Sequence, residues 1–246
     1  MTEIINSNQN TPEPQLAKPV RTFEALLELY QQGHRNFSGS DLRGITLKTL
    51  EIEVLDKEIT YLNLREIILR GSNLAAAMFK ESFPRNIRVD LTGANLQDCD
   101  LRLADLSECK LNQCNFSNSD LRRVRFWESS CRGCDFIKAN LKKLDCQLNS
   151  KNDFTASDFT SANFSGSTLS GSFRGANFSG ANLYSVSFHN FSADGADFSD
   201  ADLQDITFTS STLKYNYYNS KTKFSDKFDP VASEMELIED ESDSEE

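Results

Sequence analysis

Cys131 and Cys134 are separated by two residues, the spacing typical of zinc-binding and redox-active cysteine pairs. A structural zinc site needs four ligands. The sequence has no second pair with this spacing and only two histidines, His34 and His189. All six cysteines are therefore predicted to be reduced, buried packing residues, and we expect no metal and no cofactor.

The residues that could catalyse a reaction do not form a catalytic set in the sequence. A nucleophile and its base must converge on one point, but the two histidines lie far apart in the chain. The aspartates recur at a regular interval, which indicates a structural role rather than paired acid and base groups. Phosphate-binding patterns such as GxxxxGK(S/T) and GxGxxG are absent from the sequence. We therefore expect no catalytic residues and no enzymatic activity.

A five-residue repeat organises the middle of the chain. A large apolar residue or a cysteine, defined here as position i, returns every five positions. Position i−2 is small, position i−1 is usually Asp or Asn, and positions i+1 and i+2 are polar or glycine. The longest run of position-i residues is Leu91, Leu96, Leu101, Leu106, Leu111, Phe116, Leu121, Phe126, Cys131, Phe136, Leu141 and Cys146.

A period of five fits neither a helix nor a long strand. It fits a short extended segment followed by a turn. Residues two apart in an extended segment point the same way, so positions i−2 and i should face inward while positions i+1 and i+2 form a corner. Every cysteine falls at i−2 or i, which supports burial of the thiols. Coils built in this way must stack on one another to bury the apolar column.

The triplets Ala-Asp-Leu at residues 104–106, Ala-Asn-Phe at 162–164 and 176–178, and Ala-Asn-Leu at 181–183 resemble the A(D/N)LxX signature of the pentapeptide-repeat family. The resemblance covers roughly residues 36–218, and the helical segment before them is similar to the opening of cyanobacterial members. It implies an all-β fold: a right-handed quadrilateral β-solenoid of pentapeptide repeats, about 20 residues per coil, with a short N-terminal capping helix.

The sequence divides into four parts. Residues 1–21 are predicted to be a disordered arm, residues 22–33 a capping helix, residues 34–218 the solenoid, and residues 219–246 C-terminal cap residues followed by a disordered acidic tail. In the helix, Thr22 is the expected N-cap and Gly33 the expected residue after the C-cap. The helix itself carries an apolar stripe, which a partner could bind if it does not cover the rod.

The repeat register breaks near residues 53–63, 80–90, 147–153 and 170–172. Residues 80–90 cannot continue the repeat and are predicted to bulge as a loop. Phe83, Pro84 and Arg85 in this loop form one candidate site, because repeat proteins often place function in such insertions. The alternative is a tolerated insertion with no role.

The C-terminal part combines aromatic and acidic residues. The aromatic residues near the end of the repeats are expected to cap the last coil or to form the seam of a homodimer. Asp229 and Pro230 are predicted to start a short helix that presents Val231, Met235 and Ile238 on one side. Residues 219–246 hold 3 basic and 10 acidic residues, so they supply most of the formal net charge of -11.

A basic patch is predicted in the middle of the solenoid. Residues 20 apart should stack about 4.8 Å apart in neighbouring coils, which places basic side chains of the same repeat position in columns. An aromatic and several arginines are the residue types enriched at binding hot spots. An ordinary solvated face is the alternative, and the acidic residues 234–246 could themselves mask the patch. The predicted patch comprises Arg102, Arg122, Arg123, Trp127, Lys142 and Lys143.

These features predict a non-enzymatic scaffold or regulator that binds another protein through a rigid rod. The family resemblance and the net charge of -11 leave a DNA-mimicking modulator of DNA gyrase or topoisomerase as the alternative. The acidic composition argues against direct nucleic-acid binding. No apolar stretch is long enough for a membrane span and no signal peptide is recognisable, so we expect a cytoplasmic protein. The partner itself has no signature in the sequence.

Overall fold

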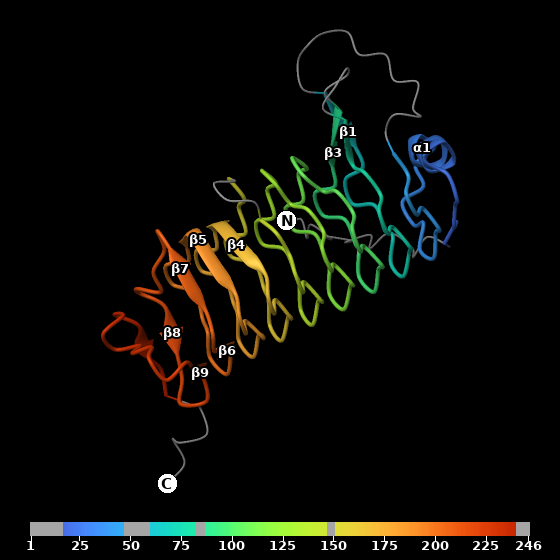
Figure 1. The fold of residues 1–246 in the computed structure, drawn as a ribbon. Helices are drawn as coiled ribbons and strands as arrows, with labels where there is room; N and C mark the ends of the chain where they lie inside the picture. Colours follow the sequence, from blue (N-terminus) through green and yellow to red (C-terminus); the bar gives the residue numbers. More distant parts are fainter. Residues whose placement is uncertain (1–16, 47–59, 82–86, 147–150, 240–246) are drawn as a thin grey trace, which may run out of the picture.

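The computed structural model describes residues 17–46, 60–81, 87–146 and 151–239, which build an elongated rod of stacked coils (Figure 1). Parallel bridges join residues at the same repeat position in successive coils. Asp100 pairs with Asp120 and Asp120 with Asn140, while Asn95 pairs with Asn115. Four such bridge positions follow one another in each coil. The predicted four-sided β-solenoid is therefore confirmed.

The rod contains few long strands, because each side of a coil is only a few residues long. The elements are α1 (Phe23–Gln31), β1 (Thr60–Asn63), β2 (Lys80–Glu81), β3 (Ile87–Asp90), β4 (Thr168–Ser172), β5 (Ser187–Ser192), β6 (Asp202–Leu203), β7 (Thr207–Thr209), β8 (Tyr217–Tyr218), β9 (Lys223–Phe224) and β10 (Glu236–Leu237). Strands β4, β5 and β7 form one parallel sheet on one side of the rod.

The helix α1 covers the N-terminal end of the rod, as expected (Figure 1). The Thr22 hydroxyl accepts a hydrogen bond from the Ala25 amide at 3.2 Å, which satisfies one of the free N–H groups of the first turn. Phe23 and Leu26 are buried, and the Phe23 ring lies edge-on to Phe79 of the first coils with centroids 6.5 Å apart. Gly33 follows the C-cap with a positive φ of 94°.

Residues 17–21 differ from the predicted disordered arm. The Lys18 amide donates to the Asn36 carbonyl at 2.9 Å, and the Asp41 amide donates to the Val20 carbonyl at 3.0 Å. Val20 is buried. The first repeats have no coil before them, so this segment supplies the partners that their backbone groups need.

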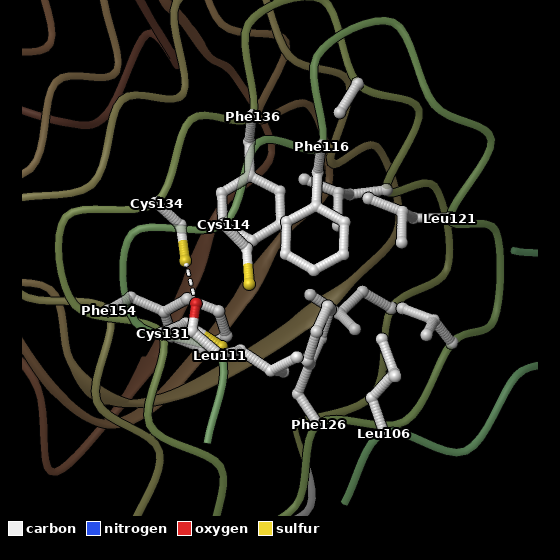
Figure 2. Close-up of a cluster of buried hydrophobic side chains, with 14 of the residues drawn as sticks. Leu106, Leu111, Cys114, Phe116, Leu121, Phe126, Cys131, Cys134, Phe136 and Phe154 are labelled. Atoms are coloured by element: carbon white, nitrogen blue, oxygen red, sulfur yellow. Dashed lines mark hydrogen bonds between the residues drawn. The ribbon is translucent and has the colours of Figure 1, made fainter. Parts of the chain in front are cut away.

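The interior is a set of side-chain columns that run along the rod (Figure 2). The Phe116 and Phe136 rings stack with centroids 4.8 Å apart, and Phe126 lies edge-on to both. All six cysteines are buried and none is in a disulfide. The Cys134 thiol donates to the Leu111 carbonyl at 2.8 Å. The inward assignment of positions i−2 and i is therefore confirmed for the cysteines.

The break at residues 80–90 is not a plain loop. Strand β3 pairs in parallel with β1 and antiparallel with β2, and its Val89 is buried. The insertion thus begins and ends in strands because Val89 supplies an inward residue to the next coil. Figure 1 shows β1 and β3 projecting at one side of the rod. Phe83, Pro84 and Arg85 lie outside the described residues.

The break at residues 170–172 is a bulge within β4, where the pairing with β5 shifts between Leu169 and Gly171. The Asn152 amide donates to the Ser170 carbonyl at 3.2 Å and to the Cys146 carbonyl at 3.0 Å. Gly171 has a φ of 112°, and a Cβ there would lie 2.4 Å from the Asn152 carbonyl oxygen. Only glycine fits this close approach.

The rod extends beyond residue 218, where the sequence predicted its end. Strand β9 pairs with β6 and β10 pairs with β8, all in parallel. The helix expected after Asp229 is a turn, whose Val231 and Ala232 amides donate to the Asp229 carboxylate. Met235 turns inward and is buried, and it thereby covers the preceding coil. Residues 233–239 are therefore ordered coil rather than disordered tail, and residues 240–246 lie outside the described part.

Candidate functional site

Two parallel columns of side chains run along one corner of the rod. Arg102, Arg122 and Lys142 occupy position i+1 of successive coils, and Arg123 and Lys143 occupy position i+2. Main-chain hydrogen bonds fix the spacing between coils: the Leu103 amide donates to the Arg122 carbonyl at 3.1 Å. The i+2 residues share a left-handed backbone, with φ of 62° at Leu103 and 59° at Arg123 and Lys143. Their side chains therefore leave the rod in the same direction.

The two columns line an open groove of about 550 Å³. Five of the six residues predicted for the basic patch are brought together there. The apolar part comes from Ala75, Ala76 and Leu103, and the Leu103 side chain is 56% exposed. The lining residues are Ala75, Ala76, Arg102, Leu103, Arg122, Arg123, Lys142 and Lys143. The groove, named here the basic groove, thus has an apolar end and a cationic middle.

Two arginines of the basic groove are already paired. Arg102 forms an ion pair with Asp100 and Arg122 forms one with Asp120, each at 2.6 Å. The hydrogen bond from Arg102 lowers the pKa of Asp100 below its ordinary value, and the hydrogen bonds to the aspartates raise the pKa of both arginines. These exposed pairs fix the side chains in place but contribute little to stability.

The other three cations of the basic groove keep their charge available. Arg123, Lys142 and Lys143 are exposed, and none of them forms an ion pair with another residue in the described part of the chain. With the five cations set against Asp100 and Asp120, the groove carries a positive charge. A surface of this kind attracts acidic groups before contact, most strongly at low salt.

Trp127 does not join the basic groove. It stands at position i+1 of the next repeat, so it lies on the next corner of the coil. Its indole N–H donates to the Asp145 carbonyl at 3.1 Å, and the Arg125 guanidinium lies 5.5 Å from the ring centroid. The half-buried ring therefore already has partners within the rod.

Sequence reasoning missed the apolar end of the basic groove. Ala75 and Ala76 belong to a coil that is separated from the next by an insertion, since Asn73 pairs with Asp100. Counting in steps of 20 residues does not connect them to Arg102. Leu103 could have been found, because it is the one large apolar residue at position i+2 between Arg102 and Lys143.

The groups with potential chemistry lie apart from one another. The His34 Nε2 atom is 2.6 Å from the Lys18 ammonium near α1, whereas His189 lies in β5. Within the described residues, no group of three His, Cys, Asp or Glu side chains could hold a metal ion. Burial raises the pKa of the Cys99 and Cys146 thiols to about 12. Among the described helices, none is long and apolar enough to cross a membrane.

The repeat pattern and the coil geometry agree with a family model. The model described as pentapeptide repeats matches residues 87–123, 119–147 and 172–209, with eight copies. The chain belongs to the pentapeptide-repeat family. The matched residues of this pentapeptide-repeat protein include all five cations of the basic groove.

Three solved structures are similar to this pentapeptide-repeat protein. HetL, involved in heterocyst differentiation regulation in the cyanobacterium Nostoc sp. strain PCC 7120, is 20% identical over 83% of this chain and 91% of that chain, with a TM-score of 0.36. QnrB1, a plasmid-mediated fluoroquinolone resistance protein, is 16% identical over 84% and 92%, with a TM-score of 0.37. Rfr23 from the cyanobacterium Cyanothece 51142 is 16% identical over 75% and 99%, with a TM-score of 0.19. Likeness at this level carries no information on function. No curated protein matches the chain in sequence.

Proposed function

We propose that this pentapeptide-repeat protein is a non-enzymatic scaffold or regulator that binds an acidic protein surface in the basic groove. The observation that carries the proposal is the groove itself, in which five cations from three neighbouring coils converge beside an apolar end. Fold alone says nothing of function, so the proposal rests on these side chains.

The stacked coils make the groove a rigid binding surface. Its side chains are anchored on hydrogen-bonded corners of successive coils, so little backbone order has to be gained on binding. Arg123, Lys142 and Lys143 supply the attraction, and Leu103 supplies apolar contact. Because the cations are exposed, binding should weaken as salt shortens the screening length to about 8–10 Å.

Charge reversal of Arg123 and Lys143 to Glu tests the proposal. Both residues are at position i+2 with positive φ, where the chain already carries Glu66, Glu108 and Glu128. The Arg123→Glu/Lys143→Glu protein should therefore fold normally. Affinity capture from extracts of the cells that make the protein should recover acidic partner proteins with the unchanged rod and lose them with this variant.

The matched control is Arg132→Glu/Lys138→Glu, which changes the net charge equally on exposed corners outside the groove. This variant should capture the same proteins as the unchanged rod. If both variants capture them equally well, the basic groove is a solvated face and the proposal is wrong. A DNA supercoiling assay with purified gyrase separates the DNA-mimic alternative, because a groove-bound scaffold predicts no effect at micromolar protein.

A further inference from the structure

We propose, building on the function proposed above, that the occupant of the basic groove is an acidic α-helix that lies along the axis of the rod. The helix presents a stripe of carboxylates to the cations and an apolar side chain to Leu103. The proposal rests on the spacing of the coils and on the two-column arrangement of the cations.

The spacing between coils favours a helix over an extended peptide. Neighbouring coils are about 4.8 Å apart, so Arg102 and Lys142 are separated by about 9.6 Å along the rod. Residues i and i+7 of a helix lie on one face about 10.5 Å apart, which matches this span. In an extended peptide, residues i and i+4 face the same way but lie about 13 Å apart. Carboxylates on an extended peptide would therefore fall out of step by the third coil.

The width of the basic groove also favours a helix. The cations stand in two columns, at positions i+1 and i+2 of each corner. A helix with acidic residues at i, i+3, i+4 and i+7 presents two adjacent stripes of carboxylates, whereas one face of an extended peptide presents a single row. The two-column groove thus matches the two stripes of a helix.

The apolar end sets the position of the helix along the rod. Ala75 and Ala76 lie at the corner of the coil that precedes Arg102, and Leu103 stands between them and the cations. In the other direction Tyr184 lies on the same corner, two coils beyond Lys142. An apolar residue one helical turn before the acidic stripe would therefore pack on Leu103.

The acidic residues at the C-terminal end of this chain are poorly placed to fill the groove of their own molecule. Glu234 pairs with Lys214 at 2.7 Å and Glu236 lies in β10, so the described part is bound to the last coil. From Asn140 the coils pass through Asn163, Asn182, Asp202 and Lys223, with β10 one coil further. Five coil spacings amount to about 24 Å.

Seven residues, 240–246, span at most about 25 Å when fully extended. They would only touch Lys143 at full stretch, and Arg102 lies about 10 Å further along the rod. A flexible chain of this length has a typical end-to-end distance of about 15 Å. The occupant is therefore a separate acidic helix.

Fluorescence anisotropy with synthetic peptides tests the inference on the full-length protein. The first peptide, of about sixteen residues so that it can form a helix, carries Leu one turn before Glu at i, i+3, i+4 and i+7 on an alanine background. The second replaces one central alanine with proline, which breaks the helix without changing the charge. Circular dichroism verifies that only the first is helical.

The helical peptide should bind at least about tenfold more tightly than the proline peptide, and Leu103→Gly should weaken its binding. Glycine suits the φ of 62° at this position, so this variant removes only the apolar contact. Equal affinities that both disappear with Arg123→Glu/Lys143→Glu would overturn the helical occupant while keeping the acidic docking groove. If neither peptide binds in a groove-dependent way, the acidic docking groove falls together with the inference.

Discussion

The rings of Phe178 and Phe198 stack with their centroids 4.9 Å apart and their planes within 2° of parallel. The two residues are twenty positions apart in the chain and occupy position i of successive coils. Phe159 stacks on Phe178 from the other side at 5.0 Å. One coil spacing is thus the stacking distance of an aromatic ring, which explains how a chain with modest apolar content forms a close-packed interior.

Replacing Phe178 with Ala should strongly destabilise the rod. The ring is fully buried, and its removal should lower the free energy of unfolding by about 3–5 kcal/mol through lost burial and a cavity. His189→Ala, at a half-buried position on the outer side of β5, should have a much smaller effect. Thermal and urea unfolding measure both variants, and equal shifts would contradict the column of stacked rings.

Gly171→Ala should destabilise the protein more than Gly166→Ala. Both glycines have positive φ, which costs an alanine about 1–2 kcal/mol. At Gly171 the new Cβ would also lie 2.4 Å from the Asn152 carbonyl, whereas at Gly166 nothing lies within 4 Å. Urea unfolding of the two variants compares them directly. Similar losses would show that the bulge in β4 does not constrain the backbone in this way.

The buried thiols should be unreactive in the folded protein. Burial raises the pKa of Cys99 and Cys146 from 9.0 to about 12, so their thiolates are scarce at neutral pH. Iodoacetamide should label all six cysteines quickly in urea and slowly in buffer. Rapid labelling of all six in buffer would contradict their burial.

The same pKa shifts predict a loss of stability in alkali. Because the folded pKa is above the unfolded pKa, the unfolded state releases protons first as the pH rises. The stabilisation is complete below about pH 9 and is lost between about pH 9 and pH 12. Cys99→Ala/Cys146→Ala should show a flatter decline of melting temperature over this range than the unchanged protein, and an equally steep decline would exclude these thiols as the cause.

The C-terminal end is predicted to form a homodimer seam. Val231 and Leu237 are 72% and 62% exposed on the last described coil, and apolar side chains exposed together mark interaction surfaces. Sedimentation velocity should give a dimer for the unchanged protein and a monomer for Leu237→Glu. A monomer at all concentrations would leave these residues as a cap only.

The five-residue period was sufficient to predict the interior, since it assigns each cysteine and phenylalanine to the inside without any long-range information. The ends were harder to predict. Val20 and Met235 lie outside the regular repeat, but they are buried because the open coils need partners there. Counting in steps of 20 residues found the five cations of the basic groove, but it misplaced Trp127 beside them and missed Ala75 and Ala76. Corners and insertions change which coil a residue belongs to, and the repeat alone does not record this.

The most direct test of the acidic docking groove is an exchange of charges between the protein and the helical peptide. The unchanged protein should bind the glutamate peptide, while Arg123→Glu/Lys143→Glu should lose this binding and instead bind a peptide with lysine in place of each glutamate. Both affinities, measured by fluorescence anisotropy, should weaken as salt is added. If the reversed protein binds the glutamate peptide as tightly as the unchanged protein does, recognition does not occur through the basic groove.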